Sequence, residues 1–374
     1  MPETTRRRPG WRAIAIQSAI LLGVMLLAYG AATNASEKLA RQGIVAGFGF
    51  LARVAGFEIS QRLIAYTAAT STYLDAILVG LLNTLLVSGL AVLIATILGF
   101  ALGIVRRGPN LLARGLAAAY VDLFRNLPLL LQLLVWYVAV RLALPDPGDP
   151  ANLADGIFLS QRGLYLPRLD VFGWGWIPVA ALLAGTVAAI TLARRVLPAI
   201  GLAVGLPALA MLGLWLAGSA AVSWPLRGPY DIEGGLPVLP EFAALLLGLS
   251  TYTAAFIAEI VRAGLASVPV GQTEAAQAIG LNRWQTLRLV TVPQAMRVIV
   301  PPLTSQYLTL TKNSSLAVLI GYPDLVHVVM GTVLNQTNQA IEAVAITMAV
   351  YLTLSLATSL LMNRYNARIA PVGR

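Results

Sequence analysis

The polar side chains of this sequence that are best placed for chemistry lie inside two long apolar segments, at residues 242–261 and 298–320. Hydroxyl, amide and ammonium groups are costly in such segments and usually face a protein interior or a water-filled cavity. Lys312 is the only lysine inside an apolar segment, so its ammonium is a candidate for binding a carboxylate. The six residues that we expect to contact a solute are Tyr252, Thr253, Gln306, Lys312, Asn313 and Ser314.

A structural role for the same side chains stays open. Hydroxyl groups in apolar helices commonly bond to their own backbone or to a neighbouring helix. Lys312 would then pair with Asp324 or Glu342. Two adjacent prolines, Pro301 and Pro302, remove two backbone donors near the start of the second segment. They predict a break or kink there.

Two pairs of opposite charges near the ends of apolar segments have helical spacing. Glu259 and Arg262 are three residues apart, and so are Asp122 and Arg125. Side chains at this spacing are neighbours on one face of a helix. We expect each pair to form an ion pair with a structural role.

The sequence has little material for an active site. It contains no cysteine, which excludes disulfides, thiolate metal sites and a cysteine nucleophile. Its one histidine, His327, is expected in a loop beside Asp324 with a structural role or none. An integral membrane enzyme would be left with serine or carboxylate chemistry, for which we find no motif. The sequence GFGFLA at 47–52 matches a weak dinucleotide-binding pattern but lacks a preceding strand, so we expect no cofactor there.

The composition indicates an all-α polytopic membrane protein. The chain has 374 residues, of which 58% are hydrophobic and 11% charged, whereas a soluble domain has about 25% charged residues. A helix needs about 20 apolar residues to cross the hydrocarbon core of a bilayer. Eight segments meet this need, at about residues 13–32, 77–104, 126–144, 175–193, 197–219, 242–261, 298–320 and 339–362.

The basic residues set the predicted orientation. About twice as many arginines and lysines fall on the side that holds both termini as on the other side, which places both termini in the cytoplasm. The net charge of +10 is scattered between apolar blocks, so we expect no nucleic-acid binding. The first apolar segment is longer than the core of a signal peptide and is expected to remain as an anchor rather than be cleaved. Of the two long outer connections, 33–76 and 145–174, the second is rich in Pro, Gly and Asp and predicts an irregular loop.

A polar stretch, GQTEAAQAIGLNRWQTLRLVTVP at 271–293, interrupts the apolar segments on the cytoplasmic side. Pro269 and Glu274 favour the start of a helix. Gly280 favours a left-handed turn, and Asn282 favours the cap of a second helix. The first helix would present a flat surface of small, mostly alanine side chains, without the basic residues that favour binding to lipid headgroups. The stretch therefore predicts an exposed helix–turn–helix that docks on another protein, with a helix lying on the membrane surface as the alternative.

This loop resembles the EAA loop of ABC-importer permeases. The matching residues are Glu274, Ala275, Ala276, Gly280 and Pro293, with Val290 and Val292 where the family pattern has Ile and Leu. In that family the loop forms a coupling helix that sits in a groove of an ATP-hydrolysing subunit. The resemblance therefore implies that the five matching residues couple this chain to an ATPase.

Further stretches resemble the polar-amino-acid subfamily of these permeases, at 80–90, 121–139, 248–276 and 312–326. An added N-terminal span, the sequence at 47–60 and two added spans near 175–219 resemble the longer permease of a general L-amino-acid importer. The resemblance implies an N-terminal anchor and periplasmic segment at 1–76. It implies a type I ABC-importer permease core at 77–374, which holds the added spans and a cytoplasmic coupling loop at 262–297.

The resemblance also implies partners. A P-loop needs a glycine-rich loop before its lysine, and neither Lys38 nor Lys312 has one. No cofactor is therefore expected on this chain, and ATP and Mg would bind to partner ABC ATPase subunits. A second permease (a paralogue or the same chain), a periplasmic amino-acid-binding protein and an amino-acid substrate would complete a multi-pass assembly in the lipid of the bacterial inner membrane. The alternative is an ion-coupled secondary transporter, but the sequence shows neither the clear internal repeats nor the central carboxylate typical of that class.

Overall fold

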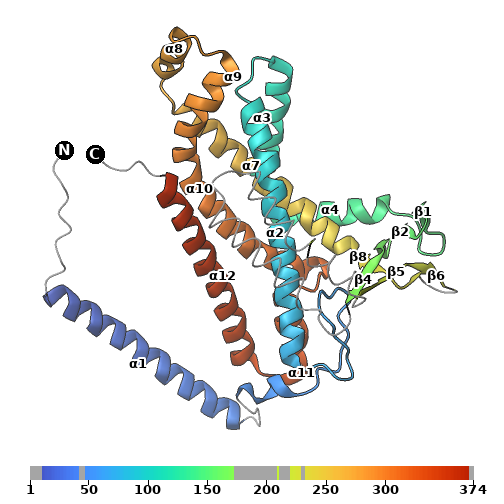
Figure 1. Ribbon diagram of the computed structural model, residues 1–374. Helices are drawn as coiled ribbons and strands as arrows, with labels where there is room; N and C mark the ends of the chain where they lie inside the picture. The colour runs from blue at the N-terminus through green and yellow to red at the C-terminus, as the bar shows by residue number, and fades with distance from the viewer. Residues whose placement is uncertain (1–10, 42–46, 172–208, 210–219, 229–231, 370–374) are drawn as a thin grey trace.

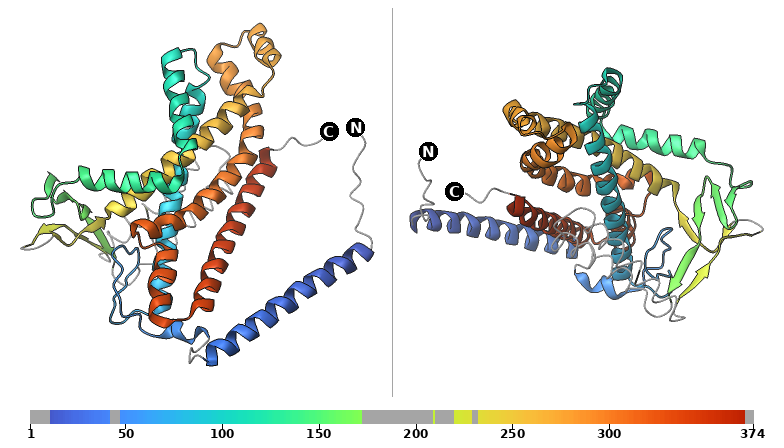
Figure 2. Two further views of the ribbon diagram at one scale, coloured as in Figure 1. Left: turned by 180° about the vertical axis from the view of Figure 1, so that it is seen from behind. Right: turned by 45° about the horizontal axis from the view of Figure 1, so that its top comes forward.

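The computed structural model describes residues 11–41, 47–171, 209, 220–228 and 232–369 (Figure 1). Long helices make up most of the described chain, and a small group of strands lies beside them (Figures 1 and 2). The predicted spans at 175–193 and 197–219 lie outside the described residues, apart from residue 209.

The helices begin and end at well-defined residues. The α-helices are α1 (Trp11–Arg41), α2 (Tyr73–Val105), α3 (Leu111–Asn126), α4 (Leu129–Ala143), α7 (Pro240–Ala266), α8 (Val270–Ala278), α9 (Arg283–Thr286), α10 (Val292–Asn313), α11 (Leu334–Thr337) and α12 (Ala340–Ile369). Two 3₁₀ helices, η1 (Phe48–Ala52) and η3 (Ser314–Ile320), and two π-helical segments, η2 (Leu287–Thr291) and η4 (His327–Val333), join them.

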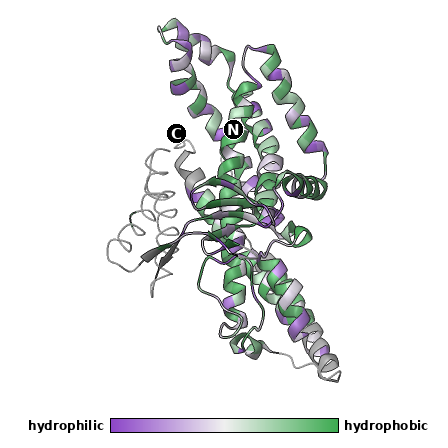
Figure 3. Ribbon diagram, turned by 90° about the vertical axis from the view of Figure 1, so that its right-hand side faces the viewer, coloured by the Kyte–Doolittle hydropathy of each residue, from purple (hydrophilic) through white to green (hydrophobic). Residues whose placement is uncertain are grey.

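Three of the described helices, α2, α7 and α12, are long and apolar enough to cross a membrane. A fourth span results if α3 and α4, which are bent by 109° relative to each other, are counted together. These helices correspond to the predicted segments 77–104, 126–144, 242–261 and 339–362. Apolar residues predominate along them (Figure 3). The structure thus confirms a helical chain with several candidate spans, and the count of eight stays a prediction.

Helix α10 is not among these spans, although it packs against two of them, α7 and α12. It covers most of the predicted segment 298–320 but carries many polar residues. The helix continues through Pro301 and Pro302, so of the predicted break or kink the break does not occur, and the kink stays a prediction. Ile299 and Leu303, which flank the prolines, are only 2% and 4% exposed. Their packing holds the helix together where two backbone hydrogen bonds are missing.

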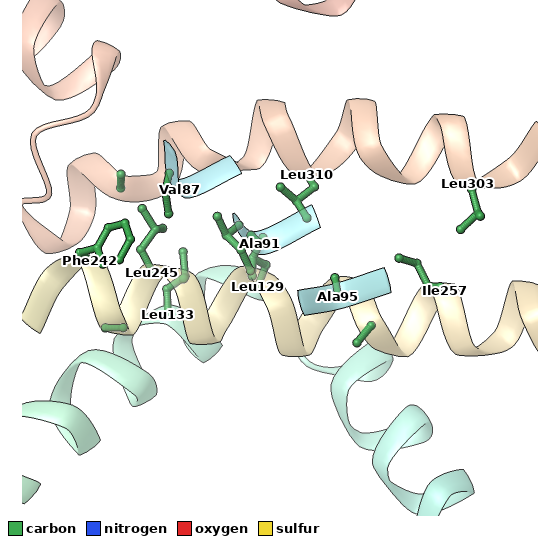
Figure 4. Packing of buried hydrophobic residues seen from close by; sticks show 14 of the residues in the cluster. Val87, Ala91, Ala95, Leu129, Leu133, Phe242, Leu245, Ile257, Leu303 and Leu310 are labelled. Atoms are coloured by element: carbon green, nitrogen blue, oxygen red, sulfur yellow. The ribbon is translucent and has the colours of Figure 1, made fainter. Parts of the chain in front are cut away.

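Small residues allow α2 and α7 to approach closely. A side chain at Gly99 would place its Cβ 2.6 Å from Ile257, and one at Gly103 would place it 2.7 Å from Val261. Close approach through small residues is a common way for helices to pack in lipid. Around this contact α2, α4, α7 and α10 share one core, shown in Figure 4 by Val87, Ala91, Ala95, Leu129, Leu133, Phe242, Leu245, Ile257, Leu303 and Leu310.

A small antiparallel sheet follows α4, where the sequence predicted an irregular loop. Its strands are β1 (Ala151–Ala154), β2 (Ile157–Ser160), β3 (Gly163–Leu166) and β8 (Leu236–Val238), in that order. Two further pairs are β4 (Arg168–Val171) with β5 (Ala220–Ser223), and β6 (Leu226–Arg227) with β7 (Ile232–Glu233).

The loop prediction is wrong because Pro, Gly and Asp dominate only the first part of the connection. After Gly156, whose φ of +74° makes the turn between β1 and β2, the sequences IFLS and GLYL are rich in residues that favour strands. The all-α expectation is corrected accordingly, to a helical chain with a small sheet. This sheet and helix α8 lie at opposite ends of α7, which has 27 residues (Figure 1).

Residues 47–72 pack on the start of α2 and on η4. Phe50, Ile59 and Tyr66 share a buried cluster with Val328 and Val333. The sequence GFGFLA forms η1 in this segment, and its central Phe50 is 2% exposed. The structure thus gives this stretch a packing role.

Candidate functional site

The loop between α7 and α10 forms an exposed helix–turn–helix. Helix α8 begins directly after Pro269 and ends before Gly280, whose φ of +88° is the left-handed conformation that favours glycine. Asn282 then caps α9 reciprocally: the N–H of Gln285 donates to Oδ1 of Asn282, and the N–H of Asn282 donates to Oε1 of Gln285, each at 2.9 Å. The predicted helix, glycine turn and capped second helix are confirmed.

The loop presents large apolar side chains that the described part of the chain leaves exposed. Val270, Ile279, Trp284 and Leu289 are 71%, 78%, 68% and 60% exposed. The loop lies at the same end of the molecule as the start of α3 (Figures 1 and 2). Exposed apolar side chains gathered on one short element are typical of an interaction surface.

The five residues predicted to couple this chain to an ATPase occupy different places in the loop. Glu274 and Ala275 are exposed on α8, and Gly280 is exposed at the turn. Pro293 is exposed in the first turn of α10. Ala276 is only 4% exposed, so it packs α8 against the rest of the loop and presents no surface of its own.

A cluster of charges lies at the end of α7 that leads into this loop. Nη2 of Arg262 lies 2.6 Å from the Glu259 carboxylate, which confirms the predicted pair. Nη1 of Arg106 lies 2.5 Å from the same carboxylate, and Nη1 of Arg125 lies 3.9 Å from it. The Arg125 guanidinium also stacks 5.3 Å from the centre of the Phe256 ring. One carboxylate therefore joins α7 to the end of α2 and to α3.

The predicted pair of Asp122 and Arg125 is wrong. Arg125 reaches across to Glu259 on α7, where it also finds an aromatic face. Helical spacing identifies only neighbours on the same helix. The participation of Arg106 was missed for the same reason, since it lies 153 residues from Glu259 and no local signal joins the two.

The six residues expected to contact a solute differ in their exposure within this chain. Thr253 and Ser314 are 3% and 0% exposed. Tyr252, Gln306 and Asn313 are half-buried, and Lys312 is exposed. Ser314 uses its hydroxyl to donate to the carbonyl of Thr311 at 2.7 Å, a bond within the chain's own backbone. No hydrogen bond joins any two of the six, all of which lie in the described part of the chain.

The structure contains neither of the two ion pairs suggested for Lys312, with Asp324 or with Glu342. Asp324 is fully buried and accepts hydrogen bonds from the backbone N–H of His327 at 2.8 Å and from the hydroxyl of Tyr351 at 3.5 Å. Glu342 is 7% exposed and accepts from the backbone N–H of Gly47 at 2.5 Å. Both carboxylates are therefore used elsewhere, and among the described residues Lys312 has no ion-pair partner.

Asp324 caps the helical segment that follows it, in the connection outside the candidate spans. His327 lies at the start of η4 in this segment, which corrects its expected place in a loop. Burial raises the pKa of the Asp324 carboxyl to about 7 and lowers the pKa of the His327 imidazole. A carboxylate at this position satisfies a free N–H at the start of the helix. Among the described residues, no group of three or more His, Asp or Glu side chains is placed to hold a metal ion.

Residues 191–371 match the profile of a family described as "Binding-protein-dependent transport system inner membrane component". The chain is 50% identical over 362 residues to the "Putative amino-acid ABC transporter permease protein YhdX" of Escherichia coli, a match that covers 91% of this chain and 90% of that protein. It is 46% identical over 381 residues to the "General L-amino acid transport system permease protein AapQ" of Rhizobium johnstonii, covering 98% of this chain and 94% of that protein.

Among solved structures, the chain is similar to one described as "Crystal structure of an amino acid ABC transporter with histidines". The TM-score is 0.48 and the sequence identity is 21%, over 79% of this chain and 95% of that chain.

Proposed function

The chain belongs to the family of binding-protein-dependent transport system inner membrane components, and from that premise we propose that it is the permease subunit of an ATP-driven importer of amino acids. Its similarity extends over nine-tenths or more of two amino-acid permeases, the YhdX and AapQ proteins. This extent supports the same role and the same class of substrate for this chain.

The observation that carries the proposal is the exposed helix–turn–helix between α7 and α10. This chain has no P-loop, because neither of its two lysines follows a glycine-rich loop. ATP and Mg would therefore bind to a separate ATPase subunit. The apolar surface of Val270, Ile279, Trp284 and Leu289 would contact that subunit, with Glu274, Ala275, Ala276, Gly280 and Pro293 forming the coupling element.

The elements around the loop offer a route from the ATPase to the spans. Helix α7 enters the loop and α10 leaves it, and the two pack closely, since a Cβ at Gly264 of α7 would clash with the side chain of Ile299 on α10. Glu259 ties α7 to Arg106 at the end of α2. A displacement of α8 would therefore move α7, α10 and α2 together, which is what alternating access requires.

We propose the rest of the assembly from the same premise. A second permease, a paralogue or the same chain, would complete the pathway, and a periplasmic amino-acid-binding protein would deliver the substrate. The chain would cross the inner membrane of a bacterium eight times with both termini in the cytoplasm. The permease core would begin at residue 77, after an anchor and a periplasmic segment.

Co-purification tests the proposal. The full chain, purified from its native membrane in detergent, should bring with it a P-loop ATPase subunit and ATP hydrolysis. Ile279→Glu should release that subunit, because it places a charge on a side chain that is 78% exposed in this chain and would become buried against the ATPase. Phe48→Glu is the matched control, since Phe48 is 54% exposed in the segment predicted on the other side of the membrane. A homo-oligomer without ATPase would refute the proposal and favour an ion-coupled transporter.

A further inference from the structure

Helix α10 carries a polar stripe on the side away from the core. The polar stripe consists of Ser305, Thr309 and Lys312, all of which are exposed in this chain. On a helix of 3.6 residues per turn these three lie within an arc of about 60°. Leu303 and Leu310, which lie roughly opposite on the helix, are buried in the core (Figure 4). The polar stripe thus occupies one face of the second half of α10, whose first half carries the exposed Val298, Pro301 and Pro302 on the same side.

The charge on this face has no counter-charge in the described part of the chain. Asp324 and Glu342, the acids proposed as partners of Lys312 from the sequence, accept backbone hydrogen bonds elsewhere. Lys312 lies in the last turn of α10, where the helix dipole favours a cation. The helix dipole does not replace an anionic partner in an apolar surrounding, because an uncompensated charge there is strongly unfavourable.

Contact with lipid tails is unfavourable for the polar stripe, and helix α12 shows which side chains such contact favours. Every fourth residue of α12 from Val344 to Leu360 is large, apolar and exposed: Val344, Met348, Leu352, Leu356 and Leu360. A row of large apolar side chains of this kind is favourable in contact with lipid tails. The polar stripe presents two hydroxyls and an ammonium instead, on a helix that packs against the spans α7 and α12.

We propose that the polar stripe lines the aqueous pathway of the transporter and that the Lys312 ammonium binds the carboxylate of the amino acid in transit. The inference rests on the proposed function, which supplies the substrate class. The hydroxyls of Ser305 and Thr309 lie on the same face and donate to or accept from the polar groups of the substrate. Because every L-amino acid carries the α-carboxylate, Lys312 recognises this class of substrate without contacting the side chain of the substrate.

Thiol labelling tests where the polar stripe faces. The natural chain has no cysteine, so a single introduced cysteine is its only thiol. Ser305→Cys and Thr309→Cys would be made in the full chain, co-purified with its partner subunits and reconstituted in liposomes. The reagent is an anionic methanethiosulfonate, which needs a hydrated thiolate and reaches no thiol in lipid.

Two control positions separate water from lipid and from the core. Leu310→Cys lies on the buried side of the same helix, and Leu356→Cys lies on the exposed apolar row of α12. Both stripe cysteines should react faster than either control, by about tenfold or more because the thiolate forms only in water. A mixture of L-amino acids should slow the reaction of Thr309→Cys.

Variants of Lys312 test the recognition of the carboxylate. In the Thr309→Cys chain, L-amino acids should protect at concentrations about 10- to 100-fold lower than their methyl esters, which lack the carboxylate charge. Lys312→Arg should keep this preference. Lys312→Met should abolish it. Labelling at Thr309→Cys without substrate should become slower, because the neighbouring ammonium no longer favours the thiolate, but should stay faster than at the control positions, which shows that the chain is folded.

Three results would overturn the inference. The stripe cysteines could react no faster than the controls, or L-amino acids could fail to slow the labelling. A disulfide could also form between two permease chains at Thr309→Cys, which would mark a packed interface. An active complex with an unreactive stripe refutes only this inference. A preparation without an ATPase subunit and without ATP-driven uptake refutes the proposed function instead.

Discussion

Arg106 at the C-terminal end of α2 donates a hydrogen bond of 2.5 Å to the carboxylate of Glu259 on α7. Arg262 binds the same carboxylate at 2.6 Å. Only 14% of the Arg106 side chain and 26% of the Glu259 side chain are exposed. Partial burial strengthens an ionic hydrogen bond and makes the loss of one partner costly. Glu259 therefore holds the end of α2 to α7, the helix that leads into the coupling loop.

Glu259→Gln should destabilise the chain and weaken coupling. It leaves Arg106 largely buried beside a neutral group, which should lower the free energy of unfolding by about 1–3 kcal/mol. Uptake per ATP hydrolysed should fall as well, because α2 is no longer held to α7. Thermal melting in detergent and paired uptake and ATPase assays in liposomes measure the two effects.

Glu58→Gln is the matched control for this variant. Glu58 pairs with Arg62 at 2.9 Å, but 63% of the Glu58 side chain is exposed. Its loss should cost only about 0–1 kcal/mol. Equal melting shifts for the two variants would show that the Glu259 cluster is no more than a surface ion pair.

Gly280→Val should block uptake while the chain still inserts in the membrane. Gly280 has a φ of +88° at the turn between α8 and α9, where a β-branched residue costs about 1–2 kcal/mol and distorts the turn. Gly280→Asn should keep most of the activity, since asparagine tolerates the left-handed conformation. Gly115→Val, on an exposed helix position with nothing within 4 Å of its Cβ, should be neutral. Wild-type uptake by Gly280→Val would mean that the turn has no part in coupling.

Features that depend on neighbouring residues could be predicted from the sequence. The coupling loop follows from Pro269, Gly280 and Asn282, each of which determines its own turn or cap by local stereochemistry. The apolar lengths of α2, α7 and α12 likewise follow from the cost of exposing polar groups to lipid. The pairing of Glu259 with Arg262 follows from helical spacing.

Features that depend on distant contacts could not be predicted. Nothing local joins Arg106 to Glu259 or moves Arg125 away from Asp122, since both contacts exist only after α2, α3 and α7 have packed. Likewise, the lack of an ion-pair partner for Lys312 among the described residues depends on Asp324 and Glu342 binding elsewhere in the fold. Within the sheet, the pairing of β3 with β8 also joins residues far apart in the chain, so no local signal indicates it.

Asp324→Asn should flatten the dependence of stability on pH. Burial raises the pKa of Asp324 from 3.8 to about 7, so the folded chain keeps a proton that the unfolded chain releases. The contribution to stability is therefore full below about pH 4 and is lost as the pH rises to about 7. Asparagine stays neutral and can still accept from the N–H of His327.

Melting temperatures in detergent between pH 4 and 7 check this prediction. Three other titratable groups among the described residues contact or adjoin Asp324, namely Tyr322, Tyr351 and His327, and all are present in both chains. The lowered pKa of the His327 imidazole makes the folded chain more stable as the pH rises, which is opposite to the effect of Asp324. A slope that stays the same in Asp324→Asn would contradict the prediction.

Gly99→Ala should destabilise the chain, because α2 and α7 touch there. The new Cβ would lie 2.6 Å from the Cβ of Ile257 and 3.0 Å from the carbonyl oxygen of Ala254, so the two helices would have to separate. Forced repacking of this kind costs about 1–3 kcal/mol. Gly89→Ala, on the same helix with nothing within 4 Å, should instead stabilise the chain by about 0.5–1 kcal/mol, because alanine favours the helix. Melting shifts of the two variants in the same direction would mean that the α2–α7 contact is looser than the structure shows.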